Sequence, residues 1–292
     1  MSSVLHDDAT FEAERRRLVG LAYRITGSRA EADDIVQDAW LRWQRADPAT
    51  VDRPAAWLTT VTSRLSLDRL KSARAQRESY VGPWLPDAAT TEPGPADHAE
   101  LAESLTMGFL AVLERLGPTE RVVFLLADVF ALPFDEIAAV VDKTPEACRQ
   151  VASRARKRVR QERPRFAPTD DEAWQVTAAF LTAAQAGDLD SLVSLLAEDA
   201  VAVSDGGAEH HAARRPVAAE RIPRFIVNLA ARLTPQDVIT ARLVNGQPGI
   251  HVERPGATPF AMAFSVAGGL VDRIFIVVNP AKVAPLDAPP VG

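Results

Sequence analysis

The stretch from Phe134 to Arg165 constrains the fold most, because it has the pattern of two short helices, a tight turn and a basic tail. Apolar residues repeat at helical spacing from Phe134 to Val141, and Asp142 then breaks the pattern. Thr144 is a favourable N-cap and Pro145 a favourable first helical residue, so a second helix is predicted to begin there. Two helices joined by a tight turn predict a helix-turn-helix.

The second of these helices carries a polar face that suits the major groove of DNA. Arginine pairs with guanine and glutamine with adenine through paired hydrogen bonds, and serine contacts either base. The polar face consists of Arg149, Gln150, Ser153 and Arg154. From Arg154 to Arg165, seven of twelve residues are Arg or Lys and one is acidic, which predicts a phosphate-binding surface. Taken alone, the stretch also fits a helical hairpin with a solvated basic end.

The charge of the chain is unevenly distributed, which matters more for nucleic-acid binding than the net charge of -6. Residues 1–166 contain 24 Lys or Arg against 25 Asp or Glu, whereas residues 167–292 contain 9 against 14. The excess of acid therefore lies at the C-terminal end. With 292 residues, of which 47% are hydrophobic, length alone predicts two globular domains.

A single cysteine, Cys148, excludes an internal disulfide framework and a multi-cysteine zinc site. It lies in the predicted second helix, where it is expected to be a small core residue, with a redox sensor as the alternative. The five histidines include one adjacent pair, and we expect neither a metal site nor a cofactor. The sequence has no run of about 18 apolar residues and no charged-then-apolar N-terminal segment, so we expect a cytoplasmic protein.

Three helices are predicted upstream, from Phe11 to Thr26, from about Glu31, and from Pro54 onward. Gly27 is suited to end the first of them. The second has an apolar stripe that includes Trp40, and its other face is acidic. The acidic face consists of Asp33, Asp34, Gln37 and Asp38. On this helix alone, such a face also fits a simple solvated surface.

The outer face of the third helix combines hydroxyl and basic side chains, which can bind backbone phosphate and unpaired bases. This face consists of Ser63, Arg64, Asp68, Lys71 and Arg74, with Arg69 and Arg77 nearby. Trp57 is expected in the core because it lies on the apolar stripe, with a base-stacking platform as the alternative.

A proline-rich stretch from Tyr80 to Ala99 follows these helices. It holds proline at four positions and lacks helical periodicity, which predicts a linker about twenty residues long. Helical spacing resumes at Glu100, and Gly117-Pro118 predicts the start of a further helix that leads into the helix-turn-helix.

The last third of the chain changes from helical to strand-like periodicity. Helices are predicted from Asp171 to Gly187, from Asp188, and from Pro216 to Leu233. Strands are predicted near Val201–Val203, Val238–Val244, Ile250–Arg254, Pro259–Val266 and Leu270–Val278, with hairpin turns at Asn245-Gly246 and Gly268-Gly269. Helices followed by antiparallel strands predict an α+β domain, a curved sheet with helices over its concave face.

Three motifs in this order resemble the sigma-70 family of transcription initiation factors. Asp33 to Arg42 is similar to the core-polymerase-binding helix of that family, and Ala56 to Leu70 to the promoter-melting helix that follows it. Phe134 to Ala138 with Ser153 to Arg156 resembles its promoter-binding helix-turn-helix. One departure is Asp142, because the turn of this motif often has glycine. Asp tolerates a left-handed backbone better than most residues, so the turn is expected to form.

Two sigma domains joined by a proline-rich linker resemble the extracytoplasmic-function (ECF) group of this family. Tyr80 to Pro86 is similar to the linker motif of the SigJ-like subgroup, which bears a C-terminal SnoaL-like extension. The resemblance implies a multidomain fold, with two all-α sigma domains and a C-terminal α+β SnoaL-like cone. The expected bounds are 8–78 for sigma domain 2, 79–99 for the linker, 100–166 for sigma domain 4 and 170–284 for the SnoaL-like domain.

The resemblance implies that core RNA polymerase and promoter DNA are the partners of the chain, and it assigns roles to the motif residues. Expected to dock on the polymerase are Asp33, Asp34, Gln37 and Asp38. Expected to trap bases of the opened minus-ten element are Ser63, Arg64, Lys71 and Arg74. Expected to read the minus-thirty-five duplex are Arg149, Gln150, Ser153 and Arg154, while phosphates are held by Arg156, Lys157, Arg158 and Arg160.

The resemblance also implies control by the C-terminal domain, with inhibition and activation both left open. SigJ-like factors have an Asp-Gly-Gly-Gly-Lys-type motif in a loop of this domain and an Asn-Pro-Asp-Lys-Leu-type motif near its end. The corresponding regulatory candidates are Asp205, Gly206, Gly207, Trp84, Asn279, Pro280 and Lys282. Glu209 stands where the first motif has lysine, which puts any role of a positive charge at that position in question.

The alternative function is a small-molecule enzyme or ligand sensor coupled to transcription, since some cones of this kind use an Asp or His as a general base. The candidates are Asp205, His210, His211 and His251. Each has a plainer interpretation, as a turn residue, loop surface or the outward member of a strand, and a fold does not imply a chemistry. We therefore expect no catalytic residue, and a small-molecule ligand is a further candidate partner. A cone filled by side chains such as Phe260, Phe264 and Phe275 would count against it.

Overall fold

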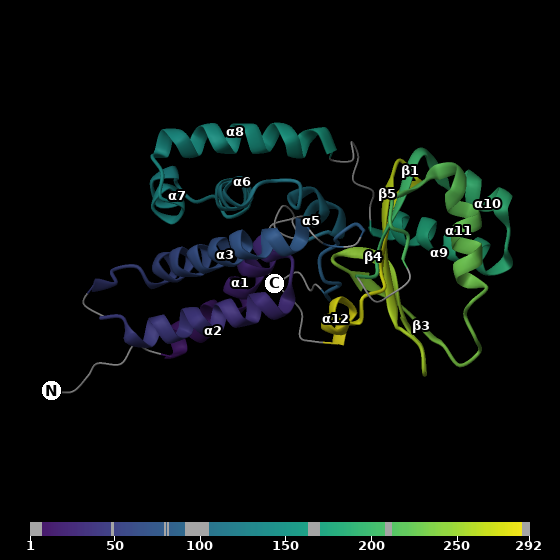
Figure 1. Cartoon of the computed structure of the whole chain (residues 1–292), viewed down its shortest axis with the longest axis horizontal. Helices are drawn as coiled ribbons and strands as arrows, with labels where there is room; N and C mark the ends of the chain where they lie inside the picture. The colour runs from purple at the N-terminus through teal and green to yellow at the C-terminus, as the bar shows by residue number, and fades with distance from the viewer. Residues whose placement is uncertain are drawn as a thin grey trace.

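The computed structural model describes residues 8–47, 50–78, 80, 82–90, 105–162, 170–207 and 212–287. Figure 1 shows a layered stack of helices at one end of the molecule and a sheet with its covering helices at the other. We call the helices before residue 79 the first helical region, those between 105 and 162 the second, and everything from 170 onward the sheet region. Tyr80 and residues 82–90 form the linker segment.

The first helical region contains α1 (Asp8–Thr26), α2 (Arg29–Arg45) and α3 (Pro54–Glu78). As predicted, α1 ends at Gly27, which has φ +72° and donates its N–H to the carbonyl of Tyr23 at 2.7 Å. Trp57 packs against Trp43 with ring centroids 5.6 Å apart, which places it at the core. Trp40 was predicted on the apolar stripe of α2, and this is wrong, because 36% of its surface is exposed.

The second helical region contains the predicted helix-turn-helix. Its elements are α5 (Met107–Leu113), α6 (Pro118–Phe124), the π-helical turn η2 (Leu125–Val129), α7 (Phe134–Val141) and α8 (Pro145–Glu162). Asp142 adopts the left-handed conformation, with φ 54° and ψ 57°. The Thr144 hydroxyl accepts a hydrogen bond from the N–H of Ala147 at 3.2 Å, as an N-cap does. Cys148 is fully buried, which confirms its place in the core.

The sheet region begins with helices and ends with strands. Its helical elements are α9 (Asp170–Ala186), α10 (Leu189–Ser194), the 3-10 turn η3 (Ala219–Arg221), α11 (Ile222–Ala230), α12 (Pro280–Val283) and the 3-10 turn η4 (Ala284–Asp287). Its strands are β1 (Leu196–Asp205), β2 (Val217–Ala218), β3 (Val238–Val244), β4 (Gln247–Glu253), β5 (Phe260–Ala267) and β6 (Leu270–Val277).

The six strands form one sheet in the order β2-β1-β6-β5-β4-β3. Neighbouring strands are antiparallel except for β1 and β6, which pair in parallel, so the sheet is mixed rather than wholly antiparallel. The predicted helix over Pro216–Leu233 is also shorter in the structure. Its first residues pair as β2 with β1, at Val201 with Ala218, and only Ile222–Ala230 are α-helical.

The two faces of this sheet are covered by different parts of the chain. One face packs on α9 and α11, where Phe180 of α9 lies 5.6 Å from Phe264 of β5. The opposite face packs on the linker segment and α5, through Leu85, Ala88 and Met107. Figure 1 agrees, with α9–α11 on one side of the strands and α5 and α12 on the other. The sheet therefore lies directly against the linker and the second helical region.

Phe275 belongs to the second of these faces and not to the interior beneath the helices, which corrects one of the three aromatic residues predicted there. Phe260 and Phe264 are in the helix-covered interior. None of the helices in the described ranges is long and apolar enough to cross a membrane.

Candidate nucleic-acid interface and linker junction

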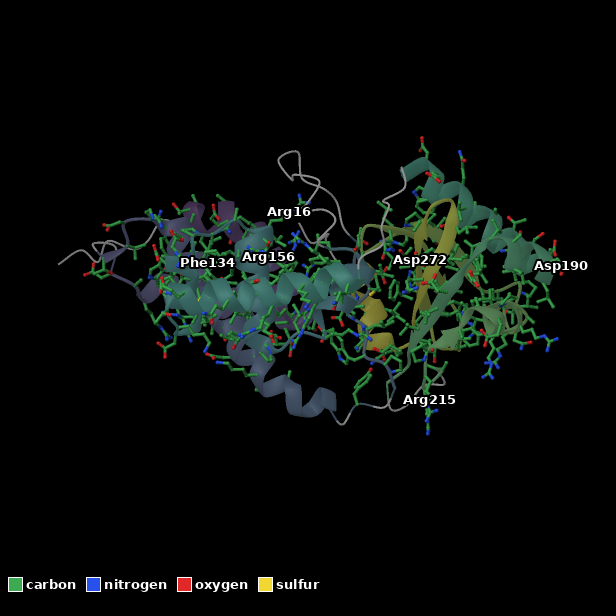
Figure 2. The ribbon with its side chains drawn as sticks, turned by 90° about the horizontal axis from the view of Figure 1, so that it is seen from above. Arg16, Phe134, Arg156, Asp190, Arg215 and Asp272 are labelled. Carbon is green, nitrogen blue, oxygen red and sulfur yellow. The ribbon has the colours of Figure 1, made fainter. Side chains whose placement is uncertain are left out.

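Helix α8 presents the four predicted base-reading side chains to solvent. Arg149, Gln150, Ser153 and Arg154 are all exposed, while the opposite side of the helix, with Cys148, Ala152 and Ala155, is buried in the core. Arg149 pairs with Glu146 at 3.0 Å, and its guanidinium lies 5.5 Å from the ring centre of Phe134. Since α8 is outermost in Figure 1 and faces the viewer in Figure 2, where Arg156 is labelled, duplex DNA can approach it.

The predicted phosphate contacts on α8 differ in how they are held. Arg156 pairs with Asp128 at 2.7 Å and Arg158 with Glu120 at 2.6 Å. Lys157 is exposed and lines a surface hollow together with Ser153, Arg156, Arg160 and Gln161. Arg156 and Arg158 are therefore each engaged by a carboxylate, whereas the side chain of Lys157 faces solvent.

The acidic face of α2 is open to solvent. Asp33, Asp34, Gln37 and Asp38 are exposed, with Asp33 receiving a hydrogen bond from Arg29 at 2.9 Å. Trp40 and Leu41 are exposed on the same helix, with 36% and 38% of their surfaces accessible. Sequence reasoning missed Trp40 as a surface residue, because a tryptophan at helical spacing is normally in a core. With the acidic side chains, Trp40 and Leu41 give α2 an exposed surface that is both acidic and apolar.

Helix α3 turns part of its predicted promoter face toward the second helical region. The guanidinium of Arg64 donates to the carbonyl of Ala139 on α7 at 2.6 Å, and Arg53, just before α3, forms an ion pair with Glu136 of α7. Ser63 was predicted on the outer face, but it is fully buried, so that prediction is wrong. Lys71 is exposed, and the side chain of Arg74 lies outside the described residues.

A second contact joins the two helical regions near the end of α1. Arg121 of α6 is almost fully buried and donates two hydrogen bonds to the carbonyl of Arg24, at 3.2 and 3.0 Å. Its guanidinium also pairs with Glu114. The two regions share one continuous apolar core, so they are packed as a single body.

The predicted regulatory residues meet at a junction between the sheet region and the linker segment. The ammonium of Lys282 lies 2.7 Å from Oδ2 of Asp205 and donates to the carbonyl of Leu85 at 2.7 Å. The same carboxylate accepts the N–H of Leu85 at 2.8 Å, and its Oδ1 accepts the hydroxyl of Tyr80 at 2.5 Å. Lys282 and Asp205 are 8% and 1% exposed, so this is a buried ion pair that the linker completes.

Aromatic rings of the linker segment enclose the lysine. The Nζ atom of Lys282 is 3.9 Å from the ring centre of Trp84 and 4.9 Å from that of Tyr80, which are cation–π distances. Burial, and then the hydrogen bond to Asp205, raise the pKa of Tyr80 well above its ordinary value, so its hydroxyl remains a donor. On its other side Trp84 lies against Gly27, where a Cβ atom would come within 2.8 Å of the ring.

The remaining regulatory candidates hold Asp205 and Lys282 in place within the sheet region. Gly207 has φ +65° and donates its N–H to Oδ1 of Asp205 at 3.0 Å. Asn279 caps α12 by accepting the N–H of Ala281 at 3.1 Å, with Pro280 as the first helical residue. A Cβ atom at Gly207 would lie 3.1 Å from the amide nitrogen of Asn279, so the two motifs touch.

Of the predicted general-base candidates, the structure describes Asp205 and His251. Asp205 is held in the ion pair with Lys282. His251 on β4 pairs with Ala261, so it shares the linker-facing side of the sheet and is turned away from the Phe180–Phe264 interior. Glu209, His210 and His211 lie outside the described residues. Among the residues that the structure describes, no group of three or more His, Cys, Asp or Glu side chains is arranged to hold a metal ion.

Comparison with known proteins gives matches along the whole chain. Residues 10–76 match the family of sigma-70 region 2, and residues 106–159 match sigma-70 region 4. The chain is 41% identical over 286 residues to the ECF RNA polymerase sigma factor SigJ of Mycobacterium tuberculosis, covering 93% of this chain and 91% of that protein. It is 35% identical over 291 residues to the probable ECF RNA polymerase sigma factor SigI of the same species, covering 97% of each.

A solved structure gives the same result for the fold. The crystal structure of the M. tuberculosis ECF sigma factor SigJ matches with a TM-score of 0.76 and 37% identity, covering 97% of this chain and 100% of that one. The similarity therefore includes both helical regions, the linker and the sheet region.

Proposed function

This chain belongs to the extracytoplasmic-function sigma factors of the sigma-70 family, and we propose how its parts act in transcription initiation. The chain binds core RNA polymerase and directs promoter-specific transcription, with its activity controlled by the fused sheet region. The observation that carries this function is the exposed base-reading face of α8 within a formed helix-turn-helix. The acidic and apolar surface of α2 is the docking surface for polymerase.

Run-off transcription with purified core polymerase tests this function. We expect the chain to direct initiation from one start site on its own promoter and to give no product on a template whose minus-thirty-five element is scrambled. Equal product from both templates would contradict promoter recognition by α8.

Replacing Arg149 by alanine should relax discrimination at one base pair of the minus-thirty-five element, at a cost of about 1 to 3 kcal/mol on the cognate sequence. Its exposed guanidinium lies on the base-reading face, beside Phe134. Lys157→Ala is the matched control, since it should weaken all sequences alike and lower the slope of log K against log salt by about one. Titration of promoter variants at several salt concentrations measures both effects. The assignment is wrong if Arg149→Ala loses affinity equally on every variant.

The packed arrangement cannot engage both promoter elements at once. The minus-ten and minus-thirty-five elements lie about 25 base pairs apart, or roughly 85 Å of duplex at about 3.4 Å per base pair. In the structure α3 contacts α7 directly, and Arg64 is bound to the carbonyl of Ala139. We therefore propose that this closed arrangement is the inactive form, and that α3 and α8 must separate before promoter opening.

The sheet region is the element that we propose to hold the chain closed. It binds the linker through Lys282 and Asp205, and it binds α5 through Phe275 and Gln247, whose side-chain oxygen accepts the N–H of Gly108 at 3.3 Å. The linker must extend when the two helical regions separate, so every contact that fixes it opposes that step. The docked sheet region is therefore expected to inhibit transcription.

The same contacts support a regulatory and not an enzymatic role for the sheet region. Asp205 is engaged by three donors from the linker and α12, and the interior beneath the helices contains the paired rings of Phe180 and Phe264. The alternative of an enzyme or small-molecule sensor gains no support from either observation. Core polymerase and promoter DNA are the partners, and we propose the cytoplasm, where transcription takes place, as the location.

A further inference from the structure

A carboxylate from the linker closes the N-terminus of the polymerase-binding helix. Oδ2 of Asp87 accepts the N–H of Arg29, the first residue of α2, at 2.8 Å and the hydroxyl of Ser28 at 3.1 Å. Ser28 is the N-cap residue, yet its own side chain makes no capping bond. A negative charge at this position accepts a backbone N–H that the first turn of a helix leaves without an intrahelical acceptor, and it interacts favourably with the positive end of the helix dipole. Asp87 therefore caps α2 from another segment of the chain.

The capping carboxylate of Asp87 is buried, so its position is set by the contacts that hold the linker segment. Asp87 is 5% exposed, and burial raises its pKa to about 6, against the opposing effects of the Arg29 N–H, Lys282 and Ser28. Its backbone N–H also donates to the carbonyl of Gly27 at 2.9 Å, so main chain and side chain dock together on the turn between α1 and α2.

Asn245 of the sheet region fixes this linker residue. Its side-chain NH2 donates to the carbonyl of Asp87 at 3.3 Å and to the hydroxyl of Tyr23 in α1 at 2.5 Å. The hydroxyl of Tyr23 in turn donates to the same Asp87 carbonyl at 2.6 Å. Asn245 and Ala89 also exchange two hydrogen bonds, N–H to carbonyl at 2.8 Å and N–H to Oδ1 at 3.0 Å.

The position of Asn245 at a hairpin tip explains how one side chain reaches all three segments. Asn245 and Gly246 both have positive φ, 50° and 69°, as a two-residue turn between β3 and β4 requires. Asn245 is nevertheless completely buried, because its tip is inserted between the linker and α1. An asparagine that served the turn alone would face solvent.

We propose that Asp87 is a positioning residue for polymerase binding, which caps α2 only while the Asn245 tip holds it, so that docking of the sheet region orders the start of the polymerase-binding helix. This inference rests on the proposed function for its link to polymerase. It gives the docked sheet region two effects of opposite sign, since the closed chain keeps α2 ready for polymerase while α3 is covered by α7.

Amide hydrogen exchange on the full chain tests the capping without any activity. Asn245→Gly keeps the turn and removes the side-chain contacts, so we expect the amides of residues 29–31 to exchange roughly 2- to 30-fold faster, the range set by loss of an N-cap. Tyr23→Phe removes the bridging hydroxyl from the other side and should act in the same direction. Asn228→Ala, an exposed asparagine of α11, is the matched control and should change nothing.

The affinity of each variant for core polymerase gives the second measurement, and it should fall by the same factor as the first-turn protection. Unchanged exchange at residues 29–31 in both Asn245→Gly and Tyr23→Phe would overturn the capping. An equal rise in α8 and α9 would also overturn it, because the contact would then be structural only. Faster first-turn exchange with unchanged polymerase affinity would refute the positioning role, and failure of the unaltered chain to bind polymerase would instead refute the proposed function.

Discussion

Replacing Lys282 by methionine is expected to release the linker and raise promoter-dependent transcription by about tenfold or more. Removing one partner of a buried ion pair costs about 3 to 5 kcal/mol, because the other charge is left without compensation. Lys282 also donates to the Leu85 carbonyl and lies over Trp84, so the substitution removes the sheet region's strongest hold on the linker. Part of this free-energy cost also applies to the form in which the two helical regions have separated. We therefore expect transcription to rise at least tenfold, which corresponds to about 1.4 kcal/mol. Run-off transcription at saturating core polymerase measures it, so that a change in polymerase affinity does not affect the result.

A second variant, Tyr80→Phe, distinguishes release of the linker from structural damage to the sheet region, because Tyr80 lies in the linker segment. It removes the linker hydroxyl that Asp205 accepts and leaves every residue of the sheet region intact, so it should raise transcription in the same direction by a smaller factor. Arg224→Ala, on the exposed side of α11, is the matched control for a lost positive charge. Lower transcription with both Lys282→Met and Tyr80→Phe, in chains whose circular dichroism is unchanged, would show that docking of the linker activates.

Local signals in the sequence predicted most of the individual elements, although they extended the helix over Pro216–Leu233 too far and missed β2. The helix-turn-helix follows from an apolar stripe, a residue that tolerates a left-handed backbone at Asp142, and the cap at Thr144, all within a few positions of one another. The hairpin at Asn245-Gly246 follows in the same way. Because such signals act over short range, they predict where an element begins and ends without any knowledge of its neighbours.

The packing of one region on another has no comparable signal. Ser63 is buried although it belongs to a polar face, and Trp40 is exposed although it continues an apolar stripe. The resemblance to known sigma factors identified Asp205 and Lys282 as regulatory candidates. It did not predict the contact of the Tyr80 ring with Lys282, or the contacts of Asp87 and Asn245. Those residues look like ordinary linker and turn residues, and only the three-dimensional contact between distant segments gives them a further role.

Locking the two helical regions together is expected to abolish transcription almost completely. Arg53 and Glu136 form an ion pair across the contact between α3 and α7, and both lie outside the predicted base-reading set. A chain with Arg53→Cys and Glu136→Cys, joined by a short bismaleimide that contains a disulfide, cannot separate α3 from α8. The promoter elements lie roughly 85 Å apart, so the joined chain should give less than about a hundredth of the product, a loss of more than 2.7 kcal/mol. Product is measured by run-off transcription before and after the disulfide is reduced.

The cross-linked chain tests whether the packed arrangement of the two helical regions is the inactive form. Each single-cysteine variant treated with the same reagent is the control, and the native Cys148 is buried. We expect the joined chain still to bind core polymerase, since the α2 surface stays exposed. It should make almost no transcript, and reduction of the disulfide should restore transcription. Equal transcription by the joined and the reduced chain would show that the two helical regions need not separate. That result would also contradict the proposed inhibitory role of the sheet region.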